Sequence, residues 1–153
     1  MYIRTAQVFD IPAIQRLYRQ LFALTAQWQP NYYRTAVQDE EFLLNTIQEP
    51  DTDILLVEDN TEVVGFLLIQ AQSTPLYTCV KPRSFAYITD LAVDERVRRQ
   101  GIGTMLLHAA GEWAGERGLE YLELSVLHEN ENARIFYAKF GMTEAIHILR
   151  KEL

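Results

Sequence analysis

The chain has 153 residues, of which 48% are hydrophobic, so it is long and apolar enough to bury an ordinary core as a single domain, residues 1–153. Its formal net charge of −7 argues against general binding to nucleic acid, and its longest apolar run, Val63 to Ile69, is far short of the ~20 residues that cross a membrane. A single cysteine, Cys79, permits no internal disulfide, and no export signal opens the chain. We therefore expect a cytoplasmic protein with neither nucleic-acid nor membrane partners.

The N-terminal part of the chain predicts one short strand, residues 3–6, followed by two helices. The first helix should begin at Asp10, because aspartate caps helices and Pro12 suits a first turn. Apolar residues then recur on one helical face. An aromatic-rich loop separates it from a second helix at residues 39–48. Three side chains of that second helix are expected to point inward: Phe42, Leu43 and Ile47.

The middle of the chain predicts three strands. Residues 53–58 and 62–70 are rich in β-branched and apolar side chains, and Asp59-Asn60-Thr61 between them predicts a hairpin turn. A loop over residues 75–84 leads into the next strand, Tyr87 to Val93.

The C-terminal part predicts two helices and two further strands. One helix starts at the glycine turn around Gly101 and ends at Arg117, where Gly118 is suited to a C-cap. Strand 119–126, a helix capped by Asn130 and a last strand at residues 143–151 follow. The predicted order is β-α-α-β-β-β-α-β-α-β, an α/β layered fold with a mixed sheet.

The turn from Arg96 to Thr104 predicts an anion site. Gly101 and Gly103 let the backbone approach a ligand closely, and the following helix start leaves N–H groups free. Arg96, Arg98 and Arg99 add positive charge suited to phosphate. The spacing does not match a P-loop, because no lysine precedes Thr104, nor a dinucleotide fingerprint, because Leu106 stands where the third glycine is needed.

Two segments resemble the GNAT superfamily of acyl-CoA-dependent N-acyltransferases. Arg98-Arg99-Gln100-Gly101-Ile102-Gly103 is similar to the family signature Gln/Arg-x-x-Gly-x-Gly/Ala. Downstream, Asn130, Ala133, Tyr137 and Gly141 are in step with the family element Asn-x-x-Ala-x-x-x-Tyr-x-x-x-Gly-Phe, with Met142 in place of the phenylalanine. The resemblance implies a mixed, mostly antiparallel sheet flanked by helices, and an acetyl-CoA-dependent N-acetyltransferase.

The resemblance also implies how the cosubstrate binds. The fourth and fifth strands should splay apart so that the pantetheine arm lies along the main chain of the fourth. The pyrophosphate should meet the glycine turn, and Asn130 should both cap its helix and contact the arm. The implied cofactor-binding residues are Leu91, Ala92, Val93, Arg98, Arg99, Gln100, Gly101, Ile102, Gly103, Thr104 and Asn130. Ile102 is also expected to face the core.

For catalysis, the resemblance implies direct attack of an amine on the thioester in a ternary complex. Tyr137 occupies the position of the general acid that protonates the departing thiolate, and the N–H of Val93 is placed to stabilise the oxyanion. Asp90, next to the pantetheine-binding residues, is a candidate general base, with a buried structural carboxylate as the alternative. Glu123 and His128 remain weaker candidates for the base.

The acceptor site should lie in variable segments. By resemblance, the loop between the first two helices and the loop before the fourth strand wall this site, and aromatic rings with carboxylates there suit a cationic amine. The expected acceptor-binding residues are Trp28, Tyr32, Tyr33 and Tyr87. Tyr77 in the second loop is a further candidate. The acceptor is an amine-bearing small molecule or peptide.

Several alternatives stay open from sequence. A non-catalytic acyl-CoA-binding regulatory module would keep the glycine turn without the acid. An acyl-cysteine intermediate at Cys79 lacks an activating histidine nearby. No residue spacing matches a metal site, so we expect no metal. A homodimer is compatible with the family, but no residue pattern specifies it.

Overall fold

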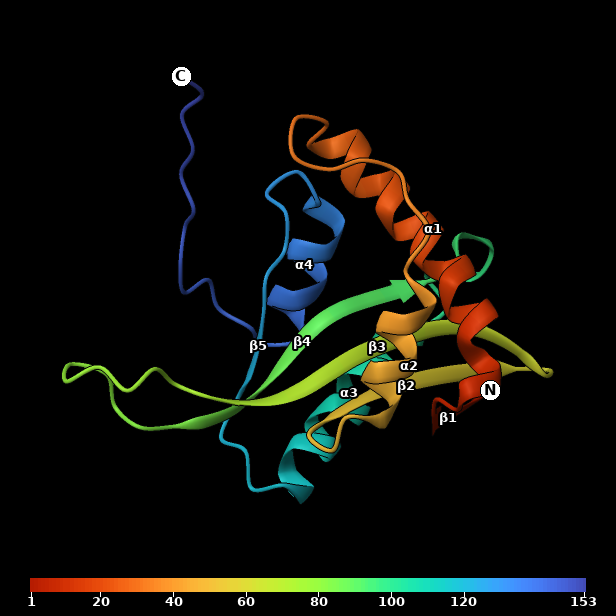
Figure 1. Cartoon of the computed structure of the whole chain (residues 1–153), viewed down its shortest axis with the longest axis horizontal. Helices are drawn as coiled ribbons and strands as arrows, with labels where there is room; N and C mark the ends of the chain where they lie inside the picture. The colour runs from red at the N-terminus through yellow and green to blue at the C-terminus, as the bar shows by residue number, and fades with distance from the viewer.

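The computed structural model describes residues 1–153 and shows one five-stranded sheet with four α-helices (Figure 1). The strands lie side by side in chain order, and every neighbouring pair is antiparallel except β4 and β5, which are parallel. The strands are β1 (Tyr2–Thr5), β2 (Thr52–Asp59), β3 (Glu62–Ser73), β4 (Ser84–Val93) and β5 (Leu122–Leu124).

The helices form a layer on each face of this sheet. α1 (Ile11–Trp28) and α2 (Glu40–Gln48) cover one face, and α3 (Ile102–Glu116) covers the other (Figure 1). α4 (Glu131–Lys139) lies beside the start of α3, with Phe136 and Phe140 against it. No helix is long and apolar enough to span a membrane.

Each face of the sheet has its own buried core, because successive strand side chains point to opposite faces. The α1 core lies under α1 and α2, and the α3 core lies under α3. The α1 core consists of Ala6, Ile11, Ile14, Leu17, Tyr18, Leu43, Ile54, Leu56, Val63, Phe66 and Leu68. The α3 core consists of Leu55, Val57, Val64, Leu67, Ile69, Ala86, Ile88, Ile102, Leu106, Leu107, Ala110, Trp113 and Ala114.

Local signals in the sequence mostly act as expected. Asp39 caps α2 by accepting a hydrogen bond from the N–H of Glu41 at 3.1 Å. Asn60 and Thr61 take up left-handed conformations in the β2–β3 turn. Gly118, with φ 66°, follows the C-terminus of α3. The predicted hairpin turn and C-cap glycine are confirmed, whereas Asp10, the predicted cap of the first helix, precedes α1 without a side-chain capping hydrogen bond.

The predicted last strand, residues 143–151, is wrong for the isolated chain. Residues 142–153 form no regular secondary structure and run away from the sheet (Figure 1). Gly141, with φ 97°, turns the chain after α4, and no strand lies beside the segment to pair with it. A strand needs a partner for its hydrogen bonds, whereas the sequence pattern reports only the side chains.

Two smaller expectations also need correction. Phe42, expected to point inward, is 41% exposed, because Leu43 is the residue of α2 that enters the α1 core. The strand predicted at residues 119–126 is short, with only Leu122–Leu124 paired to β4. β3 and β4 are longer than predicted, and the hairpin that they form projects far from the helices (Figure 1).

Candidate active site

The sheet opens between β4 and β5. The two strands pair from Ala86 with Leu122 to Ile88 with Leu124, where β5 ends, while β4 continues to Val93. From that point the edge of β4 that faces β5 has no strand beside it. A register shift against β3 leaves Thr89 as an extra residue at the place where the strands part.

The open edge of β4 presents main-chain groups of Leu91 and Val93. The N–H of Asp94 donates to the carbonyl of Val64 on β3 at 2.8 Å. Main-chain groups alternate in direction along a strand, so those of Val93 and Leu91 point away from β3 and into the gap. Ala92, opposite Phe66, turns its main-chain groups to β3. Of the three strand residues expected to hold pantetheine, Leu91 and Val93 therefore point main-chain groups into the gap, and of these the carbonyl of Val93 accepts a hydrogen bond from Arg98.

The glycine turn forms the expected cradle at the start of α3. Arg99 and Gly101 both have left-handed backbones, with φ 64° and 82°. The first helical hydrogen bond runs from the N–H of Met105 to the carbonyl of Gly101, at 3.0 Å. The N–H groups of Ile102, Gly103 and Thr104 are therefore without helical partners and are free to bind an anion.

Gly103 is required by a close approach rather than by its backbone conformation. A Cβ on Gly103 would lie 3.1 Å from the ring of Phe136 on α4. Ile102 is 1% exposed and belongs to the α3 core, as expected, so its main chain but not its side chain can serve the cradle.

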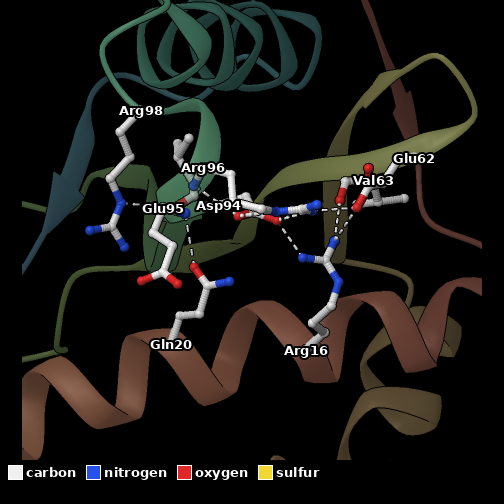
Figure 2. A network of polar contacts seen from close by, with 9 residues as sticks. Arg16, Gln20, Glu62, Val63, Asp94, Glu95, Arg96 and Arg98 are labelled. Atoms are coloured by element: carbon white, nitrogen blue, oxygen red, sulfur yellow. Dashed lines mark hydrogen bonds and ion pairs between the residues drawn. The ribbon is translucent and has the colours of Figure 1, made fainter.

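A buried carboxylate, Asp94, joins the cradle to α1 (Figure 2). Its oxygens accept hydrogen bonds from Arg16 and from Arg96, the latter from Nη2 at 2.7 Å. Arg16 also donates to the carbonyl of Val63 at 2.7 Å, and Glu62 pairs with both arginines. These partners, Arg96 first, hold the pKa of Asp94 well below its usual value.

This network corrects one expectation about the cradle. Arg96, counted among its three arginines, is held by Asp94 and Glu62 instead. Arg98 donates from Nε to the carbonyl of Val93 at 3.1 Å, at the end of the strand gap, and Arg99 has no hydrogen-bond or ion-pair partner in the chain. Arg98 and Arg99 are the two cations left for phosphate.

Tyr137 projects from α4 against the α3 core, the same core that Leu91 and Val93 contact. Its hydroxyl makes no hydrogen bond within the chain, although the ring is largely buried and packs against Phe136. Burial raises the pKa of Tyr137 to about 12, so the phenol carries its proton at neutral pH. The hydroxyl of Tyr137 therefore carries a proton, and it donates that proton to no group of the chain.

Asp90 lies on the other face of β4. Its Oδ2 accepts a hydrogen bond from the hydroxyl of Tyr18, on α1, at 2.7 Å. Burial raises the pKa of Asp90 to about 6, and the bond from Tyr18 partly opposes that rise. Tyr18 was not foreseen as a site residue. The available signal was a tyrosine on the apolar face of a helix, where the hydroxyl needs a polar partner.

The candidate acid and base therefore approach the gap from opposite faces of the sheet. Tyr137 lies with the α3 core and Asp90 with Tyr18 of the α1 core. A thioester lying along β4 would have a proton donor on one side and an ionisable carboxylate on the other. This is the arrangement that acyl transfer between two separate substrates requires.

Asn130 occupies the start of α4, where its Oδ1 accepts a hydrogen bond from the N–H of Ala133 at 3.2 Å. The expected helix cap is confirmed. The weaker base candidates Glu123 and His128 are both exposed. Cys79 is also exposed, and lies in the loop of the projecting β3–β4 hairpin.

The two loops expected to wall the acceptor site are not brought together (Figure 1). Tyr32 and Tyr33 follow α1, whereas the loop over residues 74–83, with Tyr77, forms the tip of the projecting hairpin at the far end of the molecule (Figure 1). Trp28 is the last residue of α1. Tyr87 lies on β4, where its hydroxyl is 3.1 Å from Oγ of Ser125. The two loops thus do not enclose one pocket.

A surface hollow lies elsewhere, along β1 and the start of α1. Its charged side chains pair with one another: Arg4 binds Asp10 and Glu58, each at 2.7 Å. We assign it no role in the chemistry.

Comparison with known proteins identifies the arrangement. The sequence profile described as Acetyltransferase (GNAT) family matches residues 13–142. The chain belongs to the GNAT acetyltransferase family. It is accordingly an acetyl-CoA-dependent N-acetyltransferase, which confirms the prediction from Gly101, Gly103 and Tyr137.

Individual relatives agree with this GNAT membership. The uncharacterized N-acetyltransferase YhfO of Bacillus subtilis (strain 168) is 32% identical over 147 residues, 94% of this chain and 91% of that protein. Streptothricin acetyltransferase A of the same organism is 46% identical over 96 residues, 60% of this chain and 54% of that protein. Among solved structures, a tetramutant of the BH1408 protein from Bacillus halodurans superposes with a TM-score of 0.95 at 27% identity, covering 100% of both chains.

Proposed function

We propose that residues 1–153 act as one N-acetyltransferase domain that passes the acetyl group of acetyl-CoA directly to an amine in a ternary complex. Tyr137 serves as the general acid and Asp90 as the general base. One observation supports this assignment above the others. Tyr137, whose hydroxyl has no hydrogen-bond partner, packs with the α3 core on one face of the sheet, and Asp90, a carboxylate with a raised pKa, lies on the other face of β4 beside the gap.

The residues at the gap fit acetyl-CoA. The free N–H groups of Ile102, Gly103 and Thr104, with the charges of Arg98 and Arg99, suit a pyrophosphate. Gln100 and Gly101 complete the turn around it. The main chains of Leu91 and Val93 suit the pantetheine arm, as an added strand. Asn130, at the adjoining helix start, is the proposed further contact. When bound, acetyl-CoA supplies the activated acyl group.

The chain's own groups then perform three tasks. Asp90 is ionised at pH 7, because its pKa is about 6, and it accepts the proton that an alkylamine of pKa ~10.4 must lose, through a water molecule. The N–H of Val93 stabilises the oxyanion that forms when the C–N bond forms. Tyr137 protonates the thiolate as the C–S bond breaks. Acid and base need no contact with each other.

For the acceptor we propose a small cationic amine. The acidic surface of the protein attracts cations, and Trp28, Tyr32, Tyr33 and Tyr87 remain the proposed aromatic contacts. Streptothricin acetyltransferase A, which shares the highest identity of the relatives described above, is named for an antibiotic acceptor. Antibiotic amines therefore belong in the first panel, beside polyamines and amino acids.

The test measures acetyl-CoA-dependent thiol release over panels of antibiotic amines, polyamines, amino acids and basic peptides. The wild type and Tyr137→Phe are compared, with Tyr77→Phe as the matched control on the remote hairpin. We expect release with one amine class, and a kcat at least ~100-fold lower in Tyr137→Phe alone, within the range of general acid catalysis. Equal rates in both proteins would remove Tyr137 from the mechanism. Tight CoA binding with no release for any amine would favour a non-catalytic acyl-CoA-binding module.

A further inference from the structure

The loop between α1 and α2, residues 29–39, runs back from the end of α1 toward the sheet before α2 begins (Figure 1). Residues 30–37 of this loop are exposed, whereas Gln38 is half-buried. The main-chain carbonyl of Gln38 accepts a hydrogen bond from Nε2 of Gln15, on α1, at 2.9 Å. This contact holds the end of the loop against the helix that carries Tyr18.

The side chain of Gln38 is oriented by the main chain beside it. Its Oε1 accepts a hydrogen bond from the N–H of Asp39 at 3.0 Å, so the NH₂ end of the amide is left to donate. The acceptor is the hydroxyl of Tyr18. Burial, and after it the charge of Asp90, raise the pKa of Tyr18 well above its usual value, and the hydrogen bond from Gln38 partly opposes that rise. The phenol therefore keeps its proton at neutral pH.

Tyr18 connects the amide of Gln38 to Asp90. The side chain of Tyr18 is fully buried, and its hydroxyl donates to Oδ2 of Asp90 at 2.7 Å. Amide, phenol and carboxylate thus form one directed chain of hydrogen bonds. A hydroxyl that accepts a hydrogen bond is polarised and becomes a stronger donor. Gln38 therefore strengthens the bond that Asp90 receives, although Gln38 makes no hydrogen bond to Asp90 itself.

The two oxygens of Asp90 have different surroundings. Tyr18 holds Oδ2, whereas Oδ1 has no hydrogen-bond partner in the chain. No enclosed side-chain oxygen or nitrogen lacks a partner, so Oδ1 is open to solvent. Tyr18 from α1 and Leu68, opposite on β3, are the side chains that face Asp90, and no charged group shifts its pKa. The bond at Oδ2 thus fixes the carboxylate and leaves Oδ1 free for a water molecule.

We propose that Gln38 is a positioning residue for Asp90 and that it acts through Tyr18. By holding the phenol, the amide fixes Oδ2 and keeps the carboxylate ready to accept a proton at Oδ1. The inference rests on the proposed role of Asp90 as the general base. Gln38 also ends the loop that carries the proposed acceptor contacts Tyr32 and Tyr33, so the position of this loop and the basicity of Asp90 are coupled.

The test measures the pKa of Asp90 by NMR titration of its carboxyl group and, in parallel, the acid limb of the kcat/KM profile. Gln38→Leu removes the donor, Gln38→Glu replaces it with oxygens that only accept, and Gln27→Leu, at an exposed position of α1, is the matched control. We expect the pKa to rise by at least ~0.3 unit in Gln38→Leu, to rise further in Gln38→Glu and to stay unchanged in Gln27→Leu. Above the limb Asp90 is ionised in both proteins, so the rate of Gln38→Leu should return to within about 2-fold of the wild type.

A double variant separates action through Tyr18 from a general effect of the loop. Tyr18→Phe removes the middle of the chain of hydrogen bonds, so the addition of Gln38→Leu should raise the pKa of Asp90 no further. An equal pKa in Gln38→Leu and the wild type, or a second rise in the double variant, would overturn the proposal. A rate that is lowered equally at every pH would overturn it as well, because that is the result of a merely structural role.

The two measurements also keep this inference apart from the proposed function. If the pKa of Asp90 rises in Gln38→Leu and the kcat/KM limb moves with it, both are supported. If the pKa rises while the limb stays in place, Gln38 positions Asp90 as proposed, but Asp90 is not the general base.

Discussion

Asp90 is a carboxylate whose burial carries a stability cost. Its pKa is about 6 in the folded protein, above the ordinary value of an aspartate, so the folded state holds the proton more tightly than the unfolded chain. As pH rises from about 4 to 6, the unfolded chain loses its proton first, and the free energy of unfolding falls. Above pH 6 that cost is fully present. A residue selected only for stability would not be a carboxylate here.

The first prediction concerns Asp90→Asn. The amide can still accept the bond from Tyr18, and it carries no charge to desolvate. At pH 7 we expect the free energy of unfolding to rise by roughly 1–2 kcal/mol while kcat falls by at least ~100-fold. Thermal unfolding at pH 7 and at pH 4 measures this, because the gain should vanish at pH 4. A variant that loses stability at both values would make Asp90 a structural carboxylate.

The second prediction concerns Tyr18→Phe. The hydroxyl of Tyr18 lowers the pKa of Asp90, so its removal should raise that pKa further above 6. A general base works only when deprotonated, so the acid limb of the kcat/KM profile should move to higher pH. Tyr77→Phe, on the remote β3–β4 hairpin, is the control and should leave the limb in place. An unmoved limb in Tyr18→Phe would mean that another group sets it.

At the scale of elements, α3 and α4 come close together at Gly103. The ring of Phe136 lies over Gly103, so the cradle and the helix that carries Tyr137 share one contact. Donor binding and the proton donor are thereby fixed relative to each other. The family motifs around Gly103 and Tyr137 lie far apart in the chain, but they belong to α3 and α4, the two helices that meet at this junction.

Gly103→Ala and Gly111→Ala give a matched pair on α3. A Cβ at Gly103 would meet Phe136 at 3.1 Å and push α4 away, whereas a Cβ at Gly111 meets nothing within 4 Å. We expect Gly111→Ala to stabilise the protein by about 0.5–1 kcal/mol with unchanged kinetics. Gly103→Ala should gain nothing and raise the KM for acetyl-CoA several-fold. Steady-state kinetics with thermal melts would decide, and identical behaviour of the two variants would refute the close contact.

At the scale of the whole molecule, charge should govern the encounter with the acceptor. A net charge of −7 attracts polycations over a distance that salt shortens. With a polyamine acceptor, kcat/KM should fall by roughly 3-fold or more between low salt and physiological ionic strength. A monoamine of the same class should show a smaller change. If kcat/KM showed the same salt dependence for the polyamine and the monoamine, long-range electrostatic attraction of the acceptor would not contribute to the rate.

What the sequence could predict follows from how local each feature is. Gly101, Gly118 and Asn130 act on neighbouring backbone, and each lies where its pattern predicts. The partnership of Tyr18 and Asp90 joins residues 72 positions apart, and no spacing rule reveals it. Arg96 was assigned to the cradle because sequence shows its charge but not its partners.

The C-terminal segment, residues 143–151, shows that the prediction of a whole strand also depends on partners that are distant in the sequence. The sequence predicts a strand at residues 143–151, and the segment forms none. Whether it becomes one depends on a neighbouring strand, which its own residues do not place. The family resemblance implies that the loop between α1 and α2 and the loop before β4 wall one acceptor site. The long β3–β4 hairpin instead carries the second loop away from the first.

The network around Asp94 has a consequence for how this enzyme fails under heat. Arg16 belongs to α1, which ends at the proposed acceptor contact Trp28, and Asp94 begins the segment that leads to the glycine turn proposed to bind the donor. Since the buried carboxylate needs both arginines, α1 cannot detach without leaving a charge uncompensated beside the cradle. The two binding sites therefore belong to one cooperative unit. Partial unfolding would therefore not leave a part of the protein that still binds CoA. We expect binding of the donor and binding of the acceptor to be lost at the same temperature.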